Sequence, residues 1–273
     1  MLKEHTMHTL HARFWLALLL GVVTLVLAGC PAMTDSPATS LTPGNWSVTA
    51  TSVDPAVGTI HVGGNLTQSG SDLSGSMYVV GSMCFDVSQP VSFTGTMTGT
   101  TVTLTSTAVN GQVFSVTATL TTGTDMSGTY AITGGCANGD HGTAVANAVP
   151  SIGGTWNGAV VGSDGSSVPL SVALTQDPTA SADGSFPLTG TLAYTTSVGN
   201  TCSVSGTITN AFVAGSYVLM NADTVEKDGS AGSVFYNNVL LDSSTTPLHM
   251  TGTYQVAGGD CDGDVEDITL TKQ

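Results

Sequence analysis

The sequence predicts an all-β protein built from two homologous antiparallel domains in tandem. After Trp46, short runs of alternating apolar and polar residues are separated by breaks that contain Gly, Asn or Asp. This alternation is typical of half-buried strands bounded by turns. No stretch after residue 30 shows a helical period, and the second half of the chain repeats the features of the first half in the same order.

In the first half, the alternation predicts eight strands, at residues 46–52, 58–68, 73–80, 91–98, 101–108, 112–121, 126–133 and 141–147. An even number of strands joined by local hairpins favours an eight-stranded up-and-down barrel, because closing the sheet removes its exposed edges. A pair of β-sandwiches is the alternative. Immunoglobulin-like sandwiches usually carry a Trp between their two Cys residues, whereas Trp46 and Trp156 each precede both cysteines of their half.

The duplication rests on motifs that occur once in each half. Gly-Asn-Trp at Gly44 to Trp46 corresponds to Gly-Thr-Trp at Gly154 to Trp156. Each half also contains Leu-Thr-Gln, a Met-Ser/Thr-Gly-Thr-Tyr sequence and two cysteines. A period above 100 residues indicates duplicated domains rather than a solenoid. We therefore expect β-domains at residues 45–149 and 150–273.

The Gly-x-Trp start of each half, together with the strand count, resembles the lipocalins and avidins. The resemblance covers only that tripeptide and the number of strands. It implies up-and-down barrels, and it transfers no biotin-binding or retinoid-binding residue to this chain.

The N-terminus predicts export and lipid anchoring. Lys3 and Arg13 precede an uncharged apolar run from Phe14 to Ala28. This run is shorter than the roughly 20 residues of a spanning helix. The following Leu-Ala-Gly-Cys, ending at Cys30, resembles the lipobox of bacterial lipoproteins. The resemblance implies a signal peptide at 1–29, an acylated Cys30 that binds the membrane, and a flexible linker over 30–44. Pro31, where an Asp would signal inner-membrane retention, favours the outer membrane of the bacterial envelope.

Composition excludes one class of partner. The formal net charge is −15, and after Cys30 the only basic residues besides histidine are Lys227 and Lys272. Nucleic acid binding depends on Lys and Arg that neutralise phosphates, so it is excluded. An unidentified protein or small molecule remains as a partner besides the membrane.

The remaining four cysteines are expected to form disulfides, since an exported chain enters an oxidising compartment. Four cysteines allow three pairings, and only Cys84–Cys136 with Cys202–Cys261 respects the duplication. A redox or metal-binding pair would need close spacing such as Cys-x-x-Cys, which the sequence lacks.

An acidic loop near the C-terminus is the candidate metal site. Its possible ligands are Asp260, Asp262, Asp264 and Glu266, and oxygen ligands at such spacing suit Ca²⁺. The similarity to an EF-hand loop ends at Val265, where Gly is required. A solvated acidic hairpin turn is the favoured alternative, and no other cofactor is expected.

Residues for catalysis are scattered. Three histidines (His61, His141 and His249) lie far apart in the sequence, and four carboxylates considered for glycoside hydrolysis (Asp72, Asp86, Asp125 and Asp140) stand at expected strand ends, where turns favour Asp. We expect a protein that is not an enzyme, and a carboxylate-based envelope hydrolase is the disfavoured alternative.

Recurrent aromatic residues give a candidate ligand site in each half: Trp46 and Tyr130, then Trp156 and Tyr254. They could stack on a ligand inside each barrel, or they could pack the barrel ends. The sequence therefore predicts a membrane-anchored envelope lipoprotein with a non-enzymatic binding or surface-structural role. A carrier of small hydrophobic ligands is the alternative.

Overall fold

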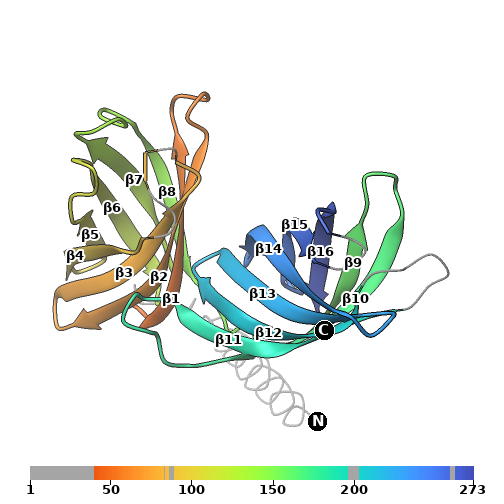
Figure 1. The fold of residues 1–273 in the computed structure, drawn as a ribbon. Coiled ribbons are helices and arrows are strands. Elements are labelled where there is room, and N and C mark those ends of the chain that lie inside the picture. The colour runs from red at the N-terminus through yellow and green to blue at the C-terminus, as the bar shows by residue number, and fades with distance from the viewer. Residues whose placement is uncertain (1–39, 83, 86–88, 196–202, 259–261) are drawn as a thin grey trace, which may run out of the picture. The chain divides into compact units, whose positions relative to one another are not determined.

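The computed structural model describes residues 40–82, 84–85, 89–195, 203–258 and 262–273 (Figure 1). These residues form strands and connecting loops. Within these ranges, no helix is both long enough and apolar enough to cross a bilayer. The predicted signal peptide, Cys30 and most of the linker lie outside the described part, as do Asp86, Cys202, Asp260 and Cys261.

The first half forms a closed antiparallel barrel of eight strands. Each strand pairs with the next, and β1 closes the sheet by pairing with β8, so Trp46 stands opposite Ala148. The expected strand ends lie within two residues of the observed ones. The strands are β1 (Gly44–Ser52), β2 (Thr59–Ser69), β3 (Asp72–Val80), β4 (Val91–Thr98), β5 (Thr101–Ser106), β6 (Val113–Thr122), β7 (Asp125–Thr133) and β8 (His141–Ala148).

The second half repeats this topology, with β9 pairing β16 to close a second eight-stranded barrel. The prediction of two tandem up-and-down barrels is confirmed, and the sandwich alternative is wrong. The strands are β9 (Gly154–Val161), β10 (Ser167–Gln176), β11 (Phe186–Tyr194), β12 (Ser203–Ala214), β13 (Tyr217–Glu226), β14 (Ala231–Asp242), β15 (His249–Ala257) and β16 (Val265–Lys272).

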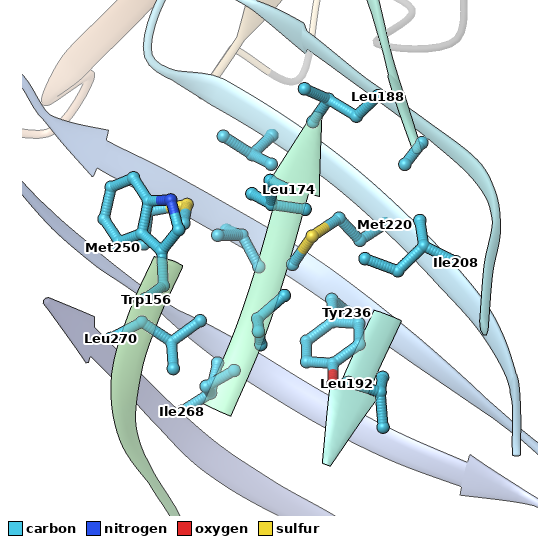
Figure 2. Close-up of a cluster of buried hydrophobic side chains, with 14 of the residues drawn as sticks. Trp156, Leu174, Leu188, Leu192, Ile208, Met220, Tyr236, Met250, Ile268 and Leu270 are labelled. Atoms are coloured by element: carbon cyan, nitrogen blue, oxygen red, sulfur yellow. The ribbon is translucent and has the colours of Figure 1, made fainter. Parts of the chain in front are cut away.

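Alternating residues of each strand fill the barrel interiors. In β5, Val102, Leu104 and Ser106 are buried, while the three threonines that alternate with them are exposed. The interior of the second barrel is packed with large apolar side chains, and Figure 2 shows Trp156 and Leu270 among them. The first barrel has an equivalent core. Because apolar burial is the main favourable term in folding, these two cores stabilise the closed sheets.

A short segment before each barrel is buried against its own barrel, and it explains two of the repeated motifs. Leu41 and Ile152 are buried, and their backbone N–H groups donate to the side-chain amide oxygens of Gln68 and Gln176. The tryptophan of each Gly-x-Trp donates its indole N–H to the carbonyl four residues earlier, at 2.8 Å in both barrels. The Trp and the Gln of each repeat therefore hold the entering chain in place.

The glycine of the repeated Met-Ser/Thr-Gly-Thr-Tyr motif is required by close packing of neighbouring strands. A Cβ atom on Gly128 would lie 2.0 Å from the carbonyl oxygen of Thr117, and one on Gly252 would lie 2.8 Å from the Cα of Val239. Real atoms do not approach so closely, so any side chain would force β6 and β7, or β14 and β15, apart. Glycine within a strand often marks such a close backbone approach.

Candidate functional site

The first barrel has a hollow at one end, which we call the mouth of the first barrel. The β1–β2, β3–β4, β5–β6 and β7–β8 connections all lie at this end, because the strands alternate in direction. The hollow has a volume of about 640 Å³, within the range of roughly 300–1,000 Å³ that small-molecule sites occupy. Its lining includes Val53, Asp54, Val57, Ala137, Asp140 and His141.

A disulfide and one glutamine hold two loops of the mouth together. Cys84 of the β3–β4 connection is bonded to Cys136 of the β7–β8 connection, with their Cα atoms 5.8 Å apart. Gln112, from the β5–β6 connection, is buried beside them. Its side-chain nitrogen donates to the carbonyl of Cys84, and its side-chain oxygen accepts the N–H of Ala137 at 3.1 Å. Gln112 thus fixes both loops through their backbones.

Asp140 is the centre of a hydrogen-bond network at the wall of the hollow. Its Oδ1 accepts the Ser52 hydroxyl at 2.6 Å, and its Oδ2 accepts the Tyr130 hydroxyl at 3.0 Å. Ser52 Oγ in turn accepts the backbone N–H of Asp54 at 3.0 Å. Because Ser52 ends β1 and Tyr130 lies on β7, the network joins two strands that both neighbour β8, and it fixes the carboxylate in one orientation.

Tyr130 supports this carboxylate from inside the barrel. Its ring stacks on Phe114, with ring centroids 5.3 Å apart and planes 8° from parallel. Burial is the main cause that raises the pKa of Tyr130 to about 12, and the bond to Asp140 raises it further while Ser52 opposes the shift. A raised phenol pKa keeps the hydroxyl protonated at neutral pH, so Tyr130 remains a donor to Asp140.

The β1–β2 loop supplies a second carboxylate and the apolar part of the rim. Asp54 Oδ1 accepts the backbone N–H of Ala56 at 2.9 Å, a local turn that Asp commonly forms. Val53 and Val57 lie beside it and keep 65% and 39% of their surfaces exposed. The rim therefore presents apolar surface next to negative charge.

The three histidines lie on different elements. His141 begins β8 at the hollow, and its Nδ1 donates to the carbonyl of Gly139 at 2.9 Å. His61 is half-buried on β2, where burial lowers its pKa. His249 begins β15 in the second barrel, where its Nδ1 is 3.0 Å from Thr271 Oγ1. Only His141 is therefore placed at the mouth of the first barrel.

The predicted aromatic pair of each barrel is buried in the interior but does not form one platform. In the first barrel, Trp46 stands opposite Ala148, whereas Tyr130 stands opposite Gly142, six residues away along β8. At about 3.3 Å per residue, the two backbone positions are roughly 20 Å apart along the strand. In the second barrel, Trp156 and Tyr254 stand opposite Lys272 and Glu266 on β16, with the same spacing.

Tyr254 belongs to a cluster of three tyrosines that the first barrel lacks. Tyr194 donates its hydroxyl to Tyr254 at 3.0 Å, and the hydroxyls of Tyr194 and Tyr236 are 3.5 Å apart. All three rings are buried, and burial raises the pKa of Tyr194 and of Tyr236. In the first barrel, Phe114 lies on β6, the strand that corresponds to β14 with its Tyr236. The two interiors therefore differ in polarity.

The described part of the acidic loop repeats the turn of the first barrel. Asp262 accepts the N–H of Gly258 at 2.9 Å, as Asn138 accepts the N–H of Gly134 at 2.8 Å. Glu266 is partly buried, and its pKa is raised by burial, then by Asp264 and Asp164. Among the described residues, no group of three or more His, Cys, Asp or Glu side chains is arranged to hold a metal ion. The hydrogen bond to Gly258 gives Asp262 a structural role in its turn.

Of the four carboxylates considered for hydrolysis, Asp86 lies outside the described residues, and the other three are not brought together. Asp72 begins β3 and Asp125 begins β7, at the end of the barrel away from the mouth, whereas Asp140 lies at the mouth. Ser52 bonds to Asp140 and to the Asp54 backbone, and the Nδ1 of His141 bonds to Gly139. The Nδ1 of His141 is therefore bonded to Gly139 and not to the Ser52 hydroxyl.

Comparisons with known proteins assign no family to this chain. No protein-family model matches it, and neither does any curated protein or any solved structure.

Proposed function

We propose that this chain is a non-enzymatic binding protein of the bacterial cell envelope, held to a membrane by an acylated Cys30. We place its binding site at the mouth of the first barrel. One observation carries this proposal, namely a hollow of about 640 Å³ whose loops are fixed by a disulfide and by Gln112. A rigid concave surface with a few oriented polar groups is the usual form of a small-molecule site.

The interior of the barrel is less suited to binding than its mouth. Phe114, Met77 and Leu104 are among the largest fully buried side chains, and they occupy the space that an internal carrier site would need. Native interiors are packed about as densely as organic crystals, so a ligand could enter only by displacing side chains. This supports binding at the mouth in preference to the carrier alternative, in which a hydrophobic ligand is enclosed inside the barrel.

Membrane attachment is tested by metabolic labelling with palmitate. We expect the wild-type chain to incorporate the label and to sediment with membranes, because two or more acyl chains anchor a protein stably. The Cys30→Ala variant should lose the label and leave the membrane fraction. The Cys84→Ala variant serves as a matched control and should keep both properties. Label that survives Cys30→Ala would reject the anchor.

Binding at the mouth is tested with a neutral fluorescent probe, N-phenyl-1-naphthylamine, excited where tryptophan does not absorb. We expect saturable binding to wild type. Ala56→Trp adds an indole ring at an exposed position that lines the hollow, and it should weaken binding at least tenfold. Thr98→Trp adds the same ring at an exposed position at the other end of the barrel, and it should leave binding unchanged.

Two outcomes contradict the site. Wild type could show no saturable binding above protein-free buffer, or Ala56→Trp could bind as tightly as Thr98→Trp. Circular dichroism of each variant confirms that the barrels remain folded, so that a loss of binding reports on the hollow itself.

A further inference from the structure

We infer that the mouth of the first barrel selects a primary ammonium group carried on a small apolar body. This inference rests on the proposed function, because it names the class of ligand for the same hollow. Three properties of the hollow carry it: its charge, the hydrogen-bonding capacity of Asp140, and the apolar rim formed by Val53 and Val57.

The charge of the first barrel excludes anionic ligands. Between residues 40 and 149 the chain contains five aspartates and no lysine, arginine or glutamate. Two of these aspartates, Asp54 and Asp140, line the hollow. His141 is the one described lining side chain that can carry a positive charge. A carboxylate or phosphate ligand would therefore meet like charge with no fixed cation to offset it, whereas a cation is attracted.

Asp140 retains capacity for a ligand. An ionised carboxylate offers about four acceptor positions, and the Ser52 and Tyr130 hydroxyls occupy two of them. Both are donors, so they hold the carboxylate in place without neutralising its charge. An ammonium group can donate to the remaining acceptor positions of the carboxylate. Hydrogen bonds between charged partners are stronger than those between neutral groups. Orientation by neighbouring side chains also reduces the entropy lost on binding.

The neutral tautomer of His141 is consistent with a ligand that donates hydrogen bonds. Its Nδ1 lies 2.9 Å from the carbonyl oxygen of Gly139, which can only accept a hydrogen bond. The proton of the neutral ring is therefore on Nδ1, and Nε2 is an acceptor. Nε2 of His141, Asp54 and Asp140 therefore give the hollow three acceptor groups for a ligand that donates hydrogen bonds.

The apolar rim favours a ligand whose body, apart from the ammonium group, is small and apolar. Val53 and Val57 expose apolar surface at the hollow, and Ala56 and Ala137 extend it. No aromatic ring lines the described part of the hollow, so an aromatic cage of the kind that holds quaternary ammonium ions is not formed there. Hydrogen bonding to carboxylate and imidazole then favours a primary ammonium, because a quaternary one has no N–H to donate.

The experiment is displacement of the bound naphthylamine probe by four compounds with the same six-carbon chain: hexylamine, hexyltrimethylammonium, hexanol and hexanoate. We expect hexylamine to bind at least tenfold more tightly than hexanol and hexyltrimethylammonium, with hexanoate the weakest. Asp140→Asn should remove most of the advantage of hexylamine over hexanol. Asp72→Asn makes the same change at the other end of the barrel and should leave that advantage intact.

Asp54→Asn provides a second variant that does not disturb the buried network, because Asp54 is exposed. It should weaken hexylamine about threefold and leave hexanol unchanged. If hexanol or hexanoate displaces the probe as well as hexylamine does, the ligand class is wrong while the binding site stands. If the advantage of hexylamine survives both Asp140→Asn and Asp54→Asn, the assignment to these carboxylates is wrong. If the probe itself does not bind, the proposed function fails before the ligand class is tested.

Discussion

Replacing Trp46 with alanine lowers the free energy of unfolding of the first barrel by about 3–5 kcal/mol, the cost usually found for removing a buried aromatic side chain. The indole is fully buried, so its loss leaves a cavity in a closed barrel that can collapse only in part. It also removes the N–H that satisfies the carbonyl of Thr42 at 2.8 Å. Chemical denaturation followed by circular dichroism measures the loss.

Two further variants separate the loss of packing from the loss of the hydrogen bond. Trp46→Phe keeps an aromatic ring but removes the hydrogen bond, so we expect a smaller loss, on the order of 1–3 kcal/mol. Trp156→Ala makes the same change in the second barrel, where the indole is also fully buried and donates to the carbonyl of Ile152. We expect losses of similar size at the two positions. A loss below about 1 kcal/mol for either alanine variant would contradict the packing role assigned to these tryptophans.

The strands and both barrels could be predicted because they depend on local signals. The alternation of β5 and the turns between strands are properties of neighbouring residues, and an even number of strands joined by local hairpins leaves few topologies other than closure. The same reasoning identified the Gly-x-Trp and Leu-Thr-Gln motifs as repeated. Both motifs hold the segment that enters each barrel. The tryptophan does so through a carbonyl four residues earlier, whereas the glutamine depends on a contact more than 20 residues away, such as the one between Gln68 and Leu41.

The mouth of the first barrel was only partly visible in the sequence. The sequence marks Cys84, Cys136, Tyr130 and Asp140 separately and for other roles. Nothing local distinguishes Gln112 from the other polar residues in turns, and it is identified only when three loops meet at its side chain. The sequence does contain one signal for this site, namely the predicted disulfide. It joins two loops at the same end of an up-and-down barrel, and so it indicates which end has loops held in place.

Removing the disulfide of the first barrel should cost about 4 kcal/mol of unfolding free energy. The cysteines are 52 residues apart, and the chain-entropy model assigns roughly that value to a loop of this length. The Cys84→Ser/Cys136→Ser double variant tests this by chemical denaturation under non-reducing conditions. It should also bind the naphthylamine probe more weakly at temperatures at which it remains folded, because two loops of the hollow then depend on Gln112 alone.

Mass spectrometry of non-reduced peptides provides an independent check, with Cys84 and Cys136 recovered in one linked pair. The same digest tests the predicted Cys202–Cys261 bond, whose cysteines lie outside the described residues. A bond between the two halves of the chain would contradict the pairing drawn from the duplication. If the double variant keeps its stability but loses probe binding, the bond shapes the hollow without holding the barrel closed. That outcome would contradict the predicted loss of about 4 kcal/mol, and it would mean that the hydrogen bonds between β1 and β8 are enough to keep the sheet closed.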